Sequence, residues 1–159
     1  MLKLSKKMDY GLMALMHLGQ HSERSSWSAR EIAGNYSIPV ELLSKILQRL
    51  VQKGLLVSHA GTHGGYSLSR PADQISAAEV IEAIEGPLSL TNCISDDGLC
   101  VQFERCNVKS PLQRLNDVVI QTFRNLTIEQ MIQRPGKDFS SGFVAEPRLV
   151  TISTFRPEV

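Results

Sequence analysis

The chain has 159 residues, of which 42% are hydrophobic, 21% charged and 6% aromatic, a composition typical of a globular protein. No run approaches the roughly 18 apolar residues of a membrane span, and the basic N-terminus lacks the cleavage site of a signal peptide, so we expect a cytoplasmic protein. Residues 1–72 hold nine Lys and Arg against four Asp and Glu, whereas residues 73–159 hold eight against twelve. The basic first half favours a polyanionic partner.

Three helices are predicted in the first half of the chain. In "DYGLMALMHLGQH" apolar residues recur at three- and four-residue spacing, which indicates an amphipathic helix. The segment "SAREIAGNY" opens with Ser28 and Glu31, the S-x-x-E capping box of a helix start. In "SIPVELLSKILQRLVQKG" we expect Pro39 in the first turn and Gly54 at the end. This third helix carries leucine and isoleucine on one face and polar residues on the other.

A β-hairpin follows the three helices. The stretch "LLVSHAGTHGGYSLS" contains two strand-like runs around a turn at Gly61–Gly65. Three helices and a hairpin make a winged helix-turn-helix, in which the third helix enters the major groove of DNA. The alternative is an ordinary amphipathic helix with a solvated polar face. The residues predicted to contact DNA are Arg30, Ser44, Lys45, Gln48, Arg49, His63 and Tyr66.

These DNA contacts have different expected partners. Ser44, Lys45, Gln48 and Arg49 are expected in the groove, where an arginine can read a guanine. Arg30 and the hairpin are expected on phosphates. For the two hairpin residues, His63 and Tyr66, a role in the turn itself is an equal alternative.

The second half begins and ends with further helices. Ser76 and Glu79 form another capping box in "PADQISAAEVIEAIEG". In "SPLQRLNDVVIQTFRNLT" we predict Ser110 as the N-cap, Pro111 in the first turn and Gln113 completing a capping box. The long helix carries an apolar stripe that favours a dimer seam over packing into the core, because palindromic DNA sites require two-fold proteins. The stripe comprises Leu112, Leu115, Val119, Phe123 and Leu126. A short helix is expected in "TIEQMIQ".

All three cysteines of the chain lie in the segment "NCISDDGLCVQFERC" between these helices. Buried cysteines that act as small apolar residues are usually scattered through core elements. An odd number of cysteines in one polar loop of a cytoplasmic protein instead indicates metal or redox chemistry rather than a structural disulfide.

The order of these segments resembles the Rrf-type winged-helix regulators, the group that contains the iron–sulfur cluster regulator IscR and the nitric-oxide sensor NsrR. The resemblance covers residues 1–133 and is carried by "MLKLSKKMDYGLMALMHL", "LLSKILQRLVQKGLLVSHAGTHGGYSLSR", "AAEVIEAIEGPL" and the three-cysteine loop before a long helix. Within the group the chain is most similar to regulators of SUF-type iron–sulfur cluster assembly.

The resemblance implies a homodimeric transcription factor, a repressor, that binds a palindromic operator and holds a [2Fe–2S] or [4Fe–4S] cluster. The implied ligands are Cys93, Cys100 and Cys106. The position of the family's histidine ligand is Lys109, which would repel iron, so Asp9 is the expected fourth ligand, as in the nitric-oxide sensors, and Glu85 the alternative.

The predicted elements, this resemblance and the proline, glycine and serine punctuation after residue 133 together divide the chain into three parts. Residues 1–72 would form the winged helix-turn-helix domain, residues 73–133 the cluster-binding loop with the dimerisation helices, and residues 134–159 a flexible tail. The expected fold class is thus mainly α, with a small β-hairpin wing and a long C-terminal dimerisation helix.

Other functions fit the cysteine pattern less well. Structural zinc sites prefer cysteine pairs two to four residues apart, and neither gap here has that spacing. A metal-free thiol switch is disfavoured because Asp96, Asp97 and Glu104 would raise thiol pKa values. An enzyme would require a fixed nucleophile with a positioned base, and no such motif is present. A protein-interaction scaffold that has lost DNA binding is the remaining alternative, and failure to bind DNA at low salt would favour it.

Overall fold

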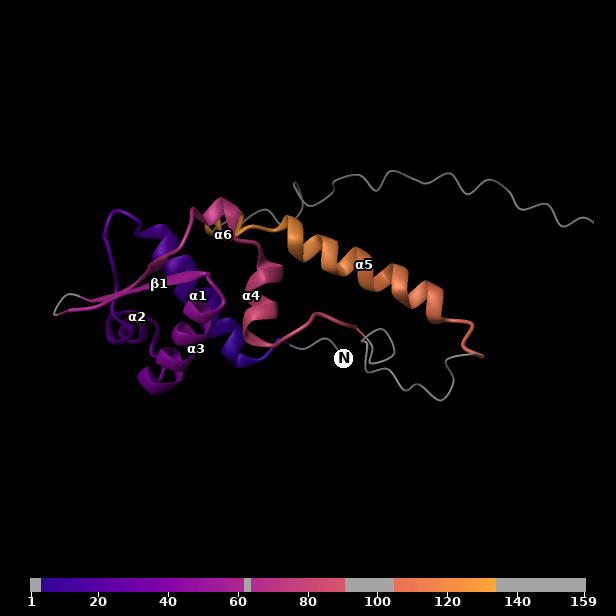
Figure 1. The fold of residues 1–159 in the computed structure, drawn as a ribbon, viewed down its shortest axis with the longest axis horizontal. Coiled ribbons are helices and arrows are strands. Elements are labelled where there is room, and N and C mark those ends of the chain that lie inside the picture. Colours follow the sequence, from indigo (N-terminus) through magenta and orange to yellow (C-terminus); the bar gives the residue numbers. More distant parts are fainter. Residues whose placement is uncertain (1–3, 62–63, 91–104, 134–159) are drawn as a thin grey trace, which may run out of the picture.

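The computed structural model describes residues 4–61, 64–90 and 105–133. Within these ranges the chain forms helices and one antiparallel pair of strands (Figure 1). The elements in chain order are α1 (Lys6–Gln20), α2 (Ala29–Tyr36), α3 (Val40–Gln52), β1 (Leu56–His59), β2 (Gly65–Leu68), the 3-10 helix η1 (Ala72–Gln74), α4 (Ala77–Ile84), α5 (Lys109–Asn125) and α6 (Ile128–Ile132). The predicted winged helix-turn-helix is confirmed. None of the described helices combines the length and the apolar character that crossing a membrane requires.

Helices α1 to α4 and α6 enclose one hydrophobic core. Its largest side chains with no or almost no exposure are Met8, Leu15, Ile32, Leu43, Leu47, Leu50, Ile75, Val80 and Ile128. Each leucine or isoleucine buried in this way stabilises the fold by about 1.5–3 kcal/mol relative to an exposed position. Because Val80 of α4 and Ile128 of α6 belong to this core, the elements that follow the hairpin are packed directly against the helix-turn-helix.

Two predicted capping boxes are confirmed. The Ser28 backbone N–H donates to the Glu31 carboxylate at 2.8 Å, and the Glu31 N–H donates to the Ser28 hydroxyl at 3.2 Å. Ser76 and Glu79 form the same reciprocal pair at the start of α4. Each box satisfies backbone N–H groups that have no partner within the helix, so short sequence signals correctly locate these two starts.

The predicted start of α5 is wrong. The helix begins at Lys109, and the residue at its N-cap is Val108, which makes no side-chain capping bond. Ser110 is therefore inside the first turn and is not the N-cap. The first-turn N–H groups have no acceptor within the helix in any case. Pro111 is consequently tolerated at the third position as well as the first, and it does not fix the starting residue.

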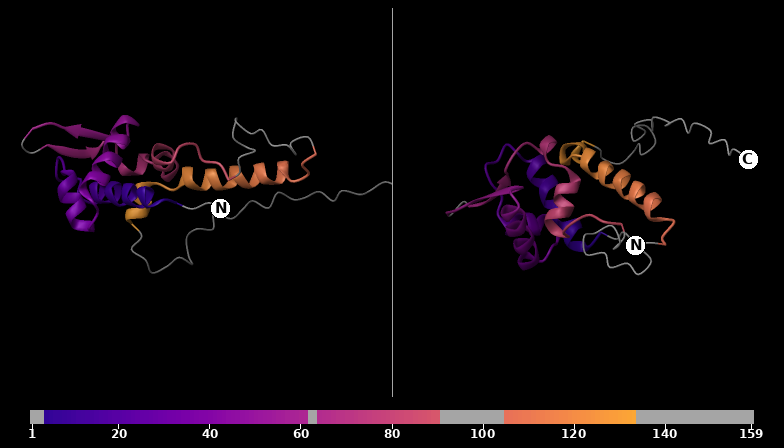
Figure 2. Two further views of the ribbon diagram at one scale, coloured as in Figure 1. Left: turned by 90° about the horizontal axis from the view of Figure 1, so that it is seen from below. Right: turned by 45° about the vertical axis from the view of Figure 1, so that its right-hand side comes forward.

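The hairpin is attached to the segment that precedes α2. Strands β1 and β2 pair from Leu56 opposite Leu68 to His59 opposite Gly65. The Trp27 N–H donates to the Tyr66 carbonyl at 3.0 Å, and the Tyr66 N–H donates to the Trp27 carbonyl at 2.8 Å. The hairpin extends beyond the helices at the end of the molecule away from α5 (Figure 2).

Candidate nucleic-acid interface and cysteine segment

Helix α3 divides its side chains between two faces. Its buried residues recur at three- and four-residue spacing and are Leu43, Ile46, Leu47 and Leu50. Of the predicted groove contacts, Lys45 and Gln48 are exposed on the opposite face, and Ser44 is half-buried at its edge. Lys45 supplies a cation and Gln48 a side-chain amide, which suit phosphates and base edges respectively. This face therefore has the chemistry to enter a DNA groove.

The predicted phosphate contacts lie on α2 and the hairpin. Arg30 is exposed in the first turn of α2, where the positive end of the helix dipole adds to its charge. Tyr66 is half-buried on β2, and its backbone is fixed by the Trp27 pair. His63 lies outside the described residues. A cation on α2 and a polar face on α3 thus come from helices that pack against each other.

Arg49 contacts another helix. Its Nε donates to the carbonyl oxygen of Ala83 at 2.7 Å. The two residues are 34 positions apart, and the bond links α3 to the last turn of α4. Sequence reasoning missed this contact because no local pattern connects the two positions. The predicted contact of Arg49 with a guanine stays a prediction.

The described residues contain one of the three cysteines. Cys106 is half-buried and stands three residues before α5 begins, whereas Cys93 and Cys100 lie outside the described residues. Thiolates are the usual ligands of iron–sulfur clusters, and an oxygen or nitrogen ligand can replace one of them. The donor chemistry of Cys106 therefore fits such a group.

The two candidate carboxylate ligands occur at one end of the fold. The Ser5 hydroxyl, at the N-cap of α1, donates to the carboxylate of Glu85, which is the C-cap of α4. Asp9 is exposed on α1 one turn after Ser5, and residues four apart share a helix face. The structure thus brings the start of α1 to the end of α4, from which the chain continues towards the cysteines.

Asn116 anchors the segment that leads to the cysteines. Its side chain is only 4% exposed, and its Oδ1 accepts a hydrogen bond from the backbone N–H of Leu90 at 3.0 Å. A buried amide with this partner satisfies an otherwise unpaired main-chain donor. Sequence reasoning missed Asn116, although its position inside the predicted apolar helix was an available signal.

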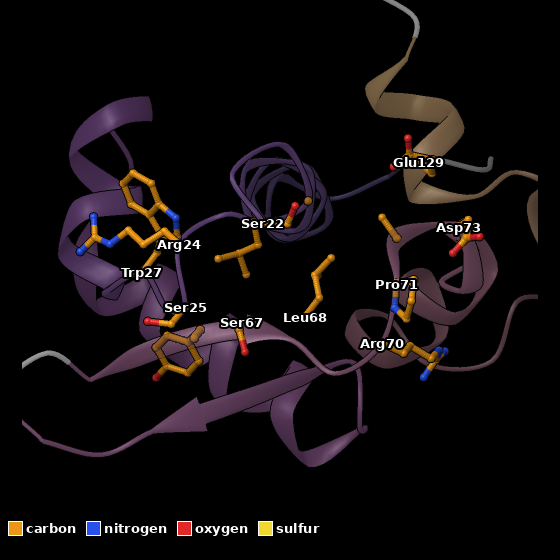
Figure 3. A pocket seen from close by; sticks show the side chains of 14 residues that line it. Ser22, Arg24, Ser25, Trp27, Ser67, Leu68, Arg70, Pro71, Asp73 and Glu129 are labelled. Atoms are coloured by element: carbon orange, nitrogen blue, oxygen red, sulfur yellow. The ribbon is translucent and has the colours of Figure 1, made fainter.

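An open cleft of about 700 Å³ lies between the end of α1, strand β2 and η1. Figure 3 shows Arg24 and Arg70 on opposite sides of this cleft. Arg24 is paired with Glu31 at 2.7 Å, and Arg70 is paired with Glu79. Both cations are therefore already neutralised by a carboxylate, so the cleft presents no unpaired arginine to an anionic ligand.

This chain is similar to several known transcriptional regulators. Residues 4–134 match the Rrf2 family, described as an iron-dependent transcriptional regulator. The HTH-type transcriptional regulator IscR of Pectobacterium carotovorum subsp. carotovorum (strain PC1) is 26% identical over 131 residues, which cover 82% of this chain and 79% of that protein.

Two solved structures have the same fold. The structure of CymR (YrzC), the global cysteine regulator of B. subtilis, has a TM-score of 0.68 and 29% identity, and the match covers 84% of this chain and 98% of that one. IscR of T. potens has a TM-score of 0.64 and 26% identity, with 83% and 87% covered. The family match spans the helix-turn-helix, the hairpin, the cysteine segment and α5. The chain belongs to the Rrf2 family, whose members are transcriptional regulators and not enzymes.

Proposed function

We propose that this protein is an iron–sulfur cluster-dependent DNA-binding repressor that controls genes of iron–sulfur cluster assembly or of the related response to iron and redox stress. The observation that carries the DNA-binding part is the exposed polar face of α3, with Lys45 and Gln48 opposite a fully buried apolar face. Membership of a family of iron-dependent regulators supports the dependence on iron.

In this proposal α3 enters the major groove and the hairpin lies against the neighbouring backbone or groove. Ser44, Lys45 and Gln48 contact the groove, while Arg30, His63 and Tyr66 contact phosphates. Two copies of the chain pair through α5 and bind a palindromic operator, which requires the two-fold symmetry of a dimer.

The proposed cluster ligands are Cys93, Cys100 and Cys106, with Asp9 as the fourth. When bound, the cluster would supply a redox- and iron-sensitive bridge between the cysteine segment and its surroundings. The similarity to IscR from two organisms supports this assignment. Glu85, bound to Ser5 near the start of α1, is the alternative oxygen ligand.

A zinc- or thiol-based regulator with the same fold and no cluster is the second candidate. The similarity to CymR, described as a global cysteine regulator, favours it. In that case the half-buried thiol of Cys106 would respond directly to oxidants.

The test begins with protein purified without oxygen, on which the visible spectrum, iron and acid-labile sulfide are measured. We expect a brown protein with absorption bands between about 320 and 460 nm. Cys106→Ala should bleach these bands, and Asn107→Ala, at the exposed neighbouring position, should keep them. A colourless protein that stays so after reconstitution with iron and sulfide would retain only the zinc- or thiol-based regulator.

The same samples are titrated with duplex DNA at increasing salt. We expect tight binding at low salt and a linear fall of the logarithm of the binding constant with the logarithm of salt concentration, because each phosphate contact releases counterions. Absence of DNA binding at low salt in every metal and redox state would contradict DNA binding itself and favour a scaffold.

A further inference from the structure

The carbonyl group of Ala83 is left without a helical partner by the sequence. In an α-helix the N–H of residue 87 would donate to the carbonyl of residue 83. Residue 87 is Pro87, which has no N–H. The preceding carbonyls are satisfied, since Glu85 donates to Ile81 at 2.7 Å and Gly86 donates to Glu82 at 3.2 Å. The Ala83 carbonyl therefore needs a hydrogen-bond donor from another element.

Arg49 of α3 supplies that partner. Its Nε–H donates to the Ala83 carbonyl at 2.7 Å, a length typical of a hydrogen bond strengthened by charge. The positive guanidinium at the end of α4 is also favourable for the helix dipole. One cation thus satisfies both the unpaired carbonyl and the negative end of α4, and this bond holds the two helices together at a defined position.

The chain that follows Ala83 is held a second time. Seven residues later, the N–H of Leu90 donates to the buried side chain of Asn116 on α5 at 3.0 Å. The segment 84–90 is therefore fixed at one end to α3 and at the other to α5. Cys93 follows Leu90 by three positions. The chain that leads to the cysteines is therefore connected, through residues 84–90, to α3, the helix proposed to read DNA.

We propose that Arg49 is a positioning residue that fixes α3 to the end of α4 and makes DNA affinity depend on the state of the segment after α4. This proposal rests on the proposed function, because it takes α3 as the reading helix. It differs from a direct guanine contact, in which Arg49 would act on the DNA itself. Coupling of two sites through such a contact typically changes affinity by about 5–150-fold.

The test compares DNA affinity in two states of the full-length protein. One state is protein purified without oxygen, and the other is the same protein treated with a chelator and hydrogen peroxide. We expect the wild-type affinities to differ at least about tenfold between the states. In Arg49→Met, which keeps the apolar stem and removes the donor, the difference should fall below about twofold, with the salt dependence of binding unchanged.

Lys45→Met is the matched control, because Lys45 lies one turn earlier on α3 and is exposed. It should weaken binding equally in both states and reduce the salt slope by about one. If Arg49→Met behaves in that same way, Arg49 contacts DNA and the proposal is wrong. It is equally wrong if the wild type binds DNA with one affinity in both states. Wild-type protein that binds no DNA at low salt instead contradicts the proposed function.

A double variant, Gly86→Ala with Pro87→Ala, tests the same contact without removing a charge and serves if Arg49→Met does not fold. Gly86 has a φ of 98°, which turns the chain out of the helix and which alanine disfavours. With both residues changed α4 can continue, so that the new N–H of residue 87 can donate to the Ala83 carbonyl and compete with Arg49. We expect the affinity difference between the two states to shrink towards that of Arg49→Met. A wild-type difference in the folded double variant, checked by circular dichroism, would overturn the proposal.

Discussion

Among the residues that the structure describes, His17 is the titratable residue with the smallest exposed fraction, 3%. Its Nδ1 lies 3.2 Å from the Tyr36 hydroxyl, and its ring packs edge-on to Trp27 at 4.5 Å. Burial lowers the pKa of His17 below its usual 6.5, the charge of His21 lowers it further, and Glu31 offsets part of the decrease. The native protein therefore keeps this ring neutral at pH values where the unfolded chain protonates it.

Because the pKa of His17 is lowered in the folded protein, acid destabilises the fold. As the pH falls below about 6.5, the unfolded chain binds a proton at His17 that the folded protein does not, so the free energy of unfolding decreases by at most about 1.4 kcal/mol for each pH unit. We predict that His17→Phe reduces the loss of stability between pH 7.5 and 5.5, even if it lowers stability at both. Urea denaturation followed by circular dichroism at the two pH values measures this difference.

His59→Gln provides the control for this experiment. His59 is exposed on β1, where its Nε2 lies 2.8 Å from the Ser67 hydroxyl. This variant removes an imidazole at the surface, and its pH dependence is the reference against which the effect of removing the buried ring of His17 is compared. The same loss of stability in His17→Phe as in the wild type would show that His17 does not titrate differently in the two states.

At the scale of elements, Gly65 determines how closely the hairpin approaches α2. A Cβ atom at this position would lie 2.4 Å from the Trp27 carbonyl oxygen, far inside van der Waals contact. We predict that Gly65→Ala pushes β2 away, lowers the free energy of unfolding by about 1–3 kcal/mol and weakens DNA binding. Chemical denaturation and DNA titration measure the two effects.

The matched control is Gly34→Ala in α2. A Cβ atom there would meet nothing within 4 Å, and alanine favours a helix interior over glycine by about 1 kcal/mol. This variant should therefore be slightly more stable than the wild type, with unchanged DNA affinity. A Gly65→Ala protein as stable as the wild type would mean that the hairpin can move away from Trp27 without lowering the free energy of unfolding.

The separation along the chain between interacting groups explains which features could be predicted from sequence. The capping boxes at Ser28 and Ser76 were found because the groups that interact are three residues apart. The bonds from Arg49 to Ala83 and from Leu90 to Asn116 join residues 34 and 26 positions apart. No local pattern specifies such contacts, because they depend on how whole helices pack. The exposed polar face of α3 was predictable, whereas the attachment of α3 to α4 was not.

At the scale of the whole molecule, α5 contacts α4 and extends away from the core to one side (Figure 1). Of its predicted apolar stripe, Phe123 packs against the core, whereas Leu115 remains 53% exposed. Val118, outside the stripe, is 64% exposed. One side of α5 therefore contributes to the fold of a single chain, and a neighbouring apolar strip does not.

That exposed strip leads to a prediction about oligomeric state. Val118→Glu places a charge where the proposed dimer would bury it, and burying an unpaired charge is strongly unfavourable. Because Val118 is 64% exposed in one chain, the substitution should leave the fold of each subunit intact. We predict a wild-type dimer, and a shift of Val118→Glu to monomer by about tenfold or more in dissociation constant, with weaker binding to palindromic DNA.

Sedimentation velocity over a range of protein concentrations measures the mass, and circular dichroism confirms that the subunits remain folded. Gln113→Glu is the control, because it adds the same charge at an exposed position of α5. Gln113 and Val118 are five residues apart, so their side chains are separated by about 140° around the helix axis. This variant should remain dimeric. If Val118→Glu stays dimeric as well, the two-fold contact lies elsewhere on the chain, and palindrome binding cannot depend on this strip of α5.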